Sequence, residues 1–141
     1  MGFRRNPPVT LFVMGRNEWV QEREYPLART QYRPLYFASG GNANSARGDG
    51  RLTWTKPAAS SLPDRFRYDP DDPVPSVGGN NCCGTPTSSG PQDQRPIEGR
   101  RDVLLYTSDI LQQEIEVTGP VKVVLFAASD GPDTDCASRR R

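Results

Sequence analysis

Residues 102–129, DVLLYTSDILQQEIEVTGPVKVVLFAAS, decide the fold, because they hold the densest apolar content of the chain and its clearest strand periodicity. In residues 114–118, Ile115 and Val117 alternate with polar side chains, as in a strand with one buried and one solvent-facing side. In residues 121–128 both alternating sets are largely apolar, so neither face of this strand is suited to water. We therefore predict two strands from the middle of a β-sandwich, with a further layer covering the outer face of the second.

Gly119 and Pro120 separate these two predicted strands. Proline has no amide hydrogen to give to a ladder, and glycine accepts a positive φ. The pair is therefore typical of either a tight hairpin or a corner where the chain passes from one sheet to another. We favour the corner.

The rest of the chain also favours short strands over helices. Among 141 residues there are 14 Pro and 13 Gly, close to a fifth of the chain, which is typical of short strands joined by long connections. The length is that of one ordinary domain. Further strands are predicted at residues 8–14, 33–38 and 51–54, with a turn at residues 15–19 and a loop at residues 39–50.

Between residues 56 and 101 the periodicity fades and eight prolines occur. A connection of this length without regular structure is unusual in a compact domain. It is either mobile or an extended segment pinned by specific contacts. We favour the second interpretation, because Phe66 and Tyr68 share one side of an extended strand and, with Val77, would lie over a partner surface.

Charge and hydropathy exclude several classes of partner. The net charge is +1, from 18 basic and 17 acidic residues, and the only basic run is residues 139–141, so we expect no nucleic-acid partner. No stretch approaches the roughly 18 apolar residues of a membrane span, and we expect no membrane partner. Arg4 and Arg5 precede only a brief apolar run without a small-residue cleavage site, so a cytoplasmic location is favoured.

The sequence does not contain the residue combinations of the common catalytic and metal sites. The sequence contains no histidine, so a Ser or Cys nucleophile lacks its usual base. Cys82, Cys83 and Cys136 form no C-x-x-C pair, and no imidazole completes a zinc site. Two adjacent cysteines with an odd third fit a reducing compartment. We therefore predict no catalytic residue, no metal ligand and no cofactor.

Three weaker patterns have a functional and a structural interpretation each. The acidic cluster Asp69, Asp71 and Asp72 would suit a calcium ion. Asp-Pro pairs are also common turn formers, and we favour a turn here. The tripeptide at residues 47–49, Arg-Gly-Asp, matches an integrin motif but is expected to be a chance match in a glycine-rich loop. Trp19 and Trp54 would suit a sugar-stacking platform, although core or domain-contact aromatics are more frequent.

Five stretches together carry a resemblance that covers nearly the whole chain. They are PPVTLFVMGRNEW (7–19), YFASGG (36–41), DRFRYDPDDPVPSVGG (64–79), DQRPIEGRRDVLLYTS (93–108) and VTGPVKVVLFAASDGPDTD (117–135). In this order and spacing they resemble the C-terminal β-domain of the CocE/NonD hydrolases, the family of esterases and X-Pro dipeptidyl-peptidases.

The resemblance implies an all-β fold, an incomplete jelly-roll (galactose-binding-like) β-sandwich with long Pro/Gly-rich loops. Residues 1–135 would be a partial X-Pro dipeptidyl-peptidase-type C-terminal domain, and residues 136–141 an aberrant or truncated tail. A jelly roll needs about eight strands, and this chain offers roughly six candidates. In the family, the Ser-His-Asp triad lies in an α/β-hydrolase domain upstream of the matched region, so no catalytic role is carried onto any residue here.

We therefore expect a fragment that is inactive alone and whose partner is a catalytic α/β-hydrolase domain missing from this chain. In the family, this domain packs against the hydrolase domain and helps shape its active site. Self-association through unpaired strand edges is a further expectation. The alternative is a free-standing jelly-roll module that binds carbohydrate or a protein partner. Such a module should have a polar outer face on residues 121–128, and this chain has an apolar one.

Overall fold

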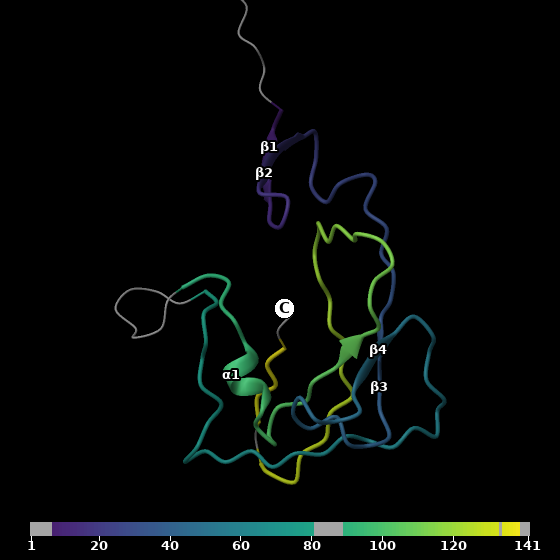
Figure 1. Ribbon diagram of the computed structural model, residues 1–141, viewed down its shortest axis with the longest axis vertical. Helices are drawn as coiled ribbons and strands as arrows, with labels where there is room; N and C mark the ends of the chain where they lie inside the picture. Colours follow the sequence, from purple (N-terminus) through teal and green to yellow (C-terminus); the bar gives the residue numbers. More distant parts are fainter. Residues whose placement is uncertain (1–6, 81–88, 133, 139–141) are drawn as a thin grey trace, which may run out of the picture. The chain divides into compact units, whose positions relative to one another are not determined.

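The computed structural model describes residues 7–80, 89–132 and 134–138 (Figure 1). The two adjacent cysteines, the basic run at residues 139–141 and the N-terminal arginines lie outside these ranges. The described elements are, in chain order, β1 (Val9–Val13), β2 (Glu18–Glu22), β3 (Tyr36–Ala38), β4 (Arg51–Thr53), α1 (Arg95–Glu98) and β5 (Thr107–Ser108). The described residues divide into two units: the hairpin unit, within residues 7–33 and 113–138, and the sheet unit, within residues 34–112.

The hairpin unit is built on the antiparallel pair β1 and β2, in which Leu11 lies opposite Val20 and Phe12 opposite Trp19. The Phe12 and Trp19 rings are 5.2 Å apart between centroids. The sequence predicted a turn at residues 15–19, which is wrong for its last two residues. Gly15 and Asn17 supply the positive φ values that reverse the chain, so pairing resumes at once and Trp19 lies in β2.

The sheet unit contains a three-stranded sheet of order β3-β4-β5, with β3 and β4 antiparallel and β4 and β5 parallel. The strands predicted at residues 33–38 and 51–54 exist but are shorter. Pro34 cannot donate to a ladder, which fits the later start of β3. The rings of Phe37, in β3, and Tyr106, just before β5, have centroids 4.6 Å apart. This aromatic contact connects the two outer strands of the sheet.

The short helix α1 lies within the segment that was predicted to lack regular structure, and that prediction is wrong for these four residues. Pro96 lies in the first turn, where a backbone amide would have no acceptor within the helix, so proline costs no hydrogen bond there. Gly99 is the C-cap of the helix. Within the described residues, the structure contains no helix with the length and apolar character needed to cross a bilayer.

The strands predicted at residues 114–118 and 121–128 are absent from the structure, where both segments make no ladder. A strand needs a hydrogen-bonded neighbour, and no described segment pairs with either of them. Between them, Gly119 has a φ of +142°, and Thr118 O accepts a hydrogen bond from Thr30 Oγ1 at 3.2 Å. Since the two segments do not pair with each other, the Gly-Pro pair does not form a hairpin.

The regular structure of the described residues is therefore mostly strand with little helix, and the strands form two small open sheets. These sheets do not show the incomplete jelly-roll sandwich that the resemblance implied. Few apolar side chains are buried: among the described residues only Val13, Leu27 and Ala43 fall in this class, and no large side chain is fully enclosed.

Candidate functional site

Asp64 is the centre of the polar network that organises the sheet unit. Its Oδ2 accepts hydrogen bonds from Tyr106 Oη at 2.6 Å and from Ser39 Oγ at 2.7 Å, and its Oδ1 accepts one from the Ala43 amide at 2.8 Å. The Gly41 amide in turn donates to Ser39 Oγ at 3.1 Å. One carboxylate thus connects the loop after β3, the proline-rich segment and the residue just before β5.

The protonation of this network follows from its contacts. Burial alone would raise the pKa of Asp64, but the bonds from Ser39, Tyr106 and the Ala43 amide outweigh it and hold the pKa below its usual range. Burial, together with the bond to Asp64, raises the pKa of Tyr106 above that of an ordinary phenol. At neutral pH the pair is a carboxylate that accepts and a phenol that donates.

The loop at residues 39–50 is tightly packed around this centre, as the close approach of its glycines shows. A Cβ at Gly48 would lie 2.5 Å from Asn42 O, and one at Gly50 would overlap Leu105 O. The Leu105 amide donates to Ala43 O at 2.8 Å and the Ser45 amide to Val103 O at 2.8 Å, which ties the loop to the segment before β5. The loop was predicted from its composition, but its contacts were not.

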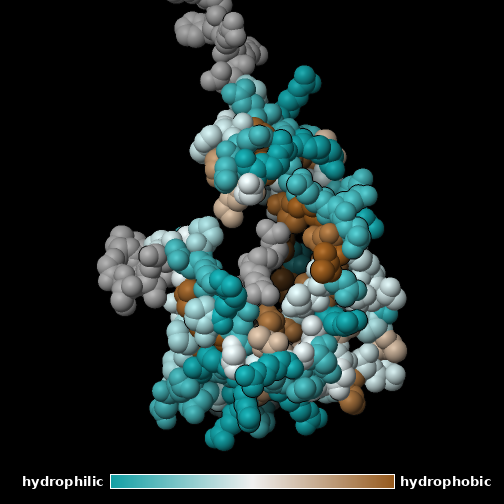
Figure 2. Space-filling view, in the orientation of Figure 1, coloured by the Kyte–Doolittle hydropathy of each residue, from teal (hydrophilic) through white to brown (hydrophobic). Residues whose placement is uncertain are grey.

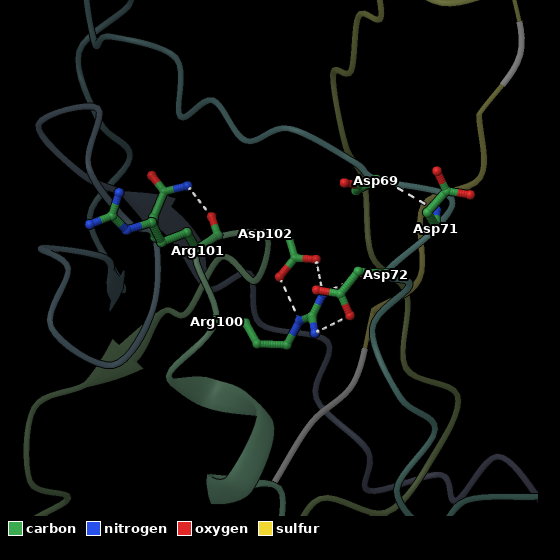
Figure 3. A network of polar contacts seen from close by, with 7 residues as sticks. Asp69, Asp71, Asp72, Arg100, Arg101 and Asp102 are labelled. Carbon is green, nitrogen blue, oxygen red and sulfur yellow. Dashed lines mark hydrogen bonds and ion pairs between the residues drawn. The ribbon is translucent and has the colours of Figure 1, made fainter.

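A second polar network is centred on Arg100, just after α1 (Figure 3). Its Nε and Nη2 donate to the two carboxylate oxygens of Asp102 at 2.8 and 2.7 Å, a bidentate pair. Nη1 and Nη2 also reach Asp72, donating to Oδ1 at 3.1 Å and to the backbone oxygen at 2.6 Å. The bonds from Arg100 hold the pKa of Asp102 below its usual range, and the bonds to Asp102 and Asp72 raise the pKa of Arg100.

The residues of the weak sequence motifs serve local structure. Asp69 Oδ1 accepts from the Asp71 amide at 3.0 Å, as in a turn, while Asp72 pairs with Arg100. Across the described ranges the structure groups no three acidic or cysteine side chains in a way that would hold a metal ion. An open depression of about 480 Å³ beside this turn is lined by three arginines and three aspartates: Arg67, Asp69, Asp72, Arg100, Arg101 and Asp102.

The Arg-Gly-Asp tripeptide lies in a loop braced by its own aspartate, and the two tryptophans lie in different units. In the Arg-Gly-Asp tripeptide, Asp49 Oδ2 accepts a hydrogen bond from the Gly40 amide at 3.0 Å, so its carboxylate braces its own loop. Trp19 belongs to the hairpin unit and Trp54 to the sheet unit. Cys136 is a free, exposed thiol.

Apolar side chains of the hairpin unit reach the surface, where Figure 2 shows apolar residues in brown. The exposed set in its second segment comprises Ile115, Val117, Val121, Val123, Val124, Leu125 and Phe126. The Phe126 side chain is fully exposed, at 102% of its reference area. An apolar run of this kind normally marks a surface that meets another protein surface.

The described residues thus offer two structural polar networks and an uncovered apolar segment, rather than a nucleophile with its base. Sequence reasoning missed Asp64 and Arg100, because single charged residues in loops carry no periodic signal. The available hint was the Asp-Arg-Phe-Arg-Tyr stretch at residues 64–68, which mixes charge with aromatic side chains. The local pattern of this stretch was interpreted only through its aromatics, and the stretch also carries part of the family resemblance.

Two comparisons with known proteins agree with this picture. A family model described as the X-Pro dipeptidyl-peptidase C-terminal non-catalytic domain matches residues 1–138. The chain is also similar to the cocaine esterase of Rhodococcus sp. (strain MB1 Bresler), with 44% identity over 133 residues. That match covers 94% of this chain and 23% of the esterase, so the chain spans less than a quarter of the length of this relative.

Proposed function

Because the chain belongs to the X-Pro dipeptidyl-peptidase C-terminal non-catalytic domain family, we propose that it is the accessory β-domain of a CocE/NonD-type serine hydrolase. In this role it packs against a catalytic α/β-hydrolase domain of the dipeptidyl-peptidase, esterase or acylase class and helps to shape its active site. It performs no chemical step itself. The sequence has no histidine, so the imidazole of a Ser-His-Asp triad has to come from outside it.

The observation that carries the proposal is the uncovered apolar segment at residues 121–126. It contains five exposed apolar side chains and one charged residue, Lys122. Burying a Val, Leu or Phe side chain contributes about 1.5 to 3 kcal/mol, so a covering surface that buries several of them gains substantially in stability. We propose that residues 114–118 and 121–128 become jelly-roll strands when neighbouring strands and the hydrolase domain are present.

The purified chain is expected to hydrolyse neither p-nitrophenyl esters nor Gly-Pro anilides, because it supplies no general base for a serine or cysteine nucleophile. Release of p-nitrophenol and of the aniline product measures this directly. Turnover above the buffer blank that follows the protein through two orthogonal columns would contradict the proposal.

The accessory role is tested by a chimera in which the matched segment of the Rhodococcus cocaine esterase is replaced by the aligned segment of this chain. We expect a soluble enzyme that hydrolyses p-nitrophenyl acetate with a kcat within about tenfold of the parent, a loss of at most about 1.4 kcal/mol in the barrier. The control is the same esterase with the segment deleted, which should be insoluble or inactive. A folded chimera without activity would overturn the role at the active site.

Replacing Phe126 with Ser is expected to increase the soluble fraction of the free chain, because it removes an apolar ring that is fully in water. The soluble fraction after centrifugation, with the far-ultraviolet circular dichroism spectrum, reports the effect. The matched control is Leu27→Ser in the same unit, where the side chain is buried and the change should cost structure. If Phe126→Ser behaves like Leu27→Ser, Phe126 belongs to the core of the chain and the assigned surface is wrong.

A further inference from the structure

The proline-rich segment of the sheet unit contains a strap, residues 65–77, that is held by side chains instead of ladder bonds. Near its start, Asn44 Nδ2 donates to Arg65 O at 2.8 Å, and at its end Gln94 Nε2 donates to Val77 O at 2.9 Å. Within the described residues, no strand or bridge includes any strap residue. Between these two ends, the strap is held at Asp72 by hydrogen bonds from Arg100.

Arg100 reaches Asp72 through two donors of one guanidinium, one to the side chain and one to the backbone oxygen. The same guanidinium is oriented by its bidentate pair with Asp102 (Figure 3). A planar group with five fixed donors makes all four contacts together, whereas a lysine ammonium could not. Arg100 thus joins the segment after α1 to a strap residue 28 positions earlier in the chain.

The two ends of this contact differ in their access to water. The Asp102 side chain is 13% exposed and that of Arg100 is 24% exposed, whereas the Asp72 side chain is 74% exposed. Dissolved ions therefore screen the Asp72 end more than the Asp102 end. The contact of Arg100 with Asp102 is therefore expected to outlast its contact with Asp72 as salt is added.

We propose that Arg100 is a salt-sensitive latch that holds the strap at Asp72 and releases it as ionic strength rises. The strap carries Phe66 and Tyr68, whose side chains are about half exposed. When the latch is closed these two aromatic side chains have a fixed position, and when it opens they are free to move. The latch therefore controls how the sheet unit presents its exposed aromatics. This inference does not depend on the proposed function.

Limited trypsin digestion of the esterase chimera tests the latch, because the free chain is not expected to be a stably folded monomer. The strap contains two exposed cleavage sites, Arg65 and Arg67. Mass spectrometry gives the cleavage rate at both sites relative to Arg23 in the hairpin unit. Arg100→Ala is expected to raise this relative rate about tenfold, and Arg100→Lys about threefold. For the unaltered chimera, the relative cleavage rate should rise several-fold between 20 mM and 1 M NaCl, where the Debye length falls to about 3 Å.

Two matched variants separate the latch from a general effect of charge. Arg101→Ala removes the adjacent, exposed arginine side chain. The contact of Arg101 drawn in Figure 3 is at its backbone oxygen, which accepts a hydrogen bond from Asn44 Nδ2 at 2.8 Å and is kept in the variant, so the relative rate should stay unchanged. Asp72→Asn keeps the backbone acceptor but loses the charge, so it should abolish most of the salt dependence. Equal rates for Arg100→Ala and Arg101→Ala would overturn the proposal. So would a rise that is equal at Arg23 and in the strap, since Arg100 would then support the whole fold.

Discussion

In the chimera, Asp64→Ala is expected to lower the local free energy of unfolding around the loop at residues 39–50 by about 2 to 4 kcal/mol. The change removes the charged acceptor of three hydrogen bonds, which come from Tyr106, Ser39 and the Ala43 amide. A hydrogen bond to a charged group contributes about 1.5 to 3 kcal/mol. The expected total is smaller than three such bonds because the site is partly exposed to water. Hydrogen exchange measured by mass spectrometry should show roughly 30- to 700-fold faster exchange of the Ser45 and Leu105 amides. These two amides bond to backbone oxygens and do not touch Asp64.

Two variants act as controls for Asp64→Ala. Tyr106→Phe removes one of the three bonds and keeps the ring against Phe37, so its effect should be the smaller one, about 1 to 1.5 kcal/mol. Asp69→Ala removes a carboxylate from the exposed turn and should change exchange at Ser45 and Leu105 little. If Asp64→Ala has no more effect than Asp69→Ala, Asp64 is not the centre of the network.

The contribution of Asp64 also has a defined pH dependence. Its pKa is lowered in the folded state, so the folded state favours the carboxylate, and the stabilisation is fully present above the ordinary value of 3.8. The stabilisation is lost as the pH falls from there through the lower folded pKa. The difference in protection between the unaltered chimera and Asp64→Asn should therefore be constant from pH 5 to 7 and shrink below about pH 4.

Local patterns in the sequence predicted the parts of the fold whose pairing is also local. The run at residues 8–14 contains β1, and only four residues separate it from its partner β2, so one turn completes the pair. The sequence also predicted the short strands β3 and β4 and their connecting loop. It did not predict β5, because two residues pair there in parallel with β4 only after the intervening segment has been held in place.

Residues 114–118 and 121–128 show the limit of periodicity as a predictor. Alternation states which side chains a strand would bury, but ladder bonds also need a neighbour, and no described segment provides one. The polar networks were unpredictable for another reason. Asp64 and Tyr106 are 42 residues apart, and nothing in either local pattern indicates that they meet. The resemblance predicted the family of the chain, whereas the local patterns predicted the secondary structure of some of its segments.

The second large expected effect concerns the chain alone, which should not be a stably folded monomer. Ordering the backbone costs about 1 to 2 kcal/mol per residue, while a stable domain retains only about 5 to 15 kcal/mol in total. Against this cost, the described residues bury few apolar side chains and leave the segment at residues 121–126 in water. This segment has one charge and no proline, and its backbone is not paired in a ladder, so it favours strand pairing with a second copy.

The most direct test of whether the apolar surface needs a covering partner is thermal melting of the free chain. The melting is followed by circular dichroism over a hundredfold range of concentration, and sedimentation gives the mass of the species. The account predicts a broad transition, or one whose midpoint rises with concentration as copies associate. A sharp transition at the same temperature across the whole range, from a species of monomer mass, would show that the chain closes its own core and would contradict the account.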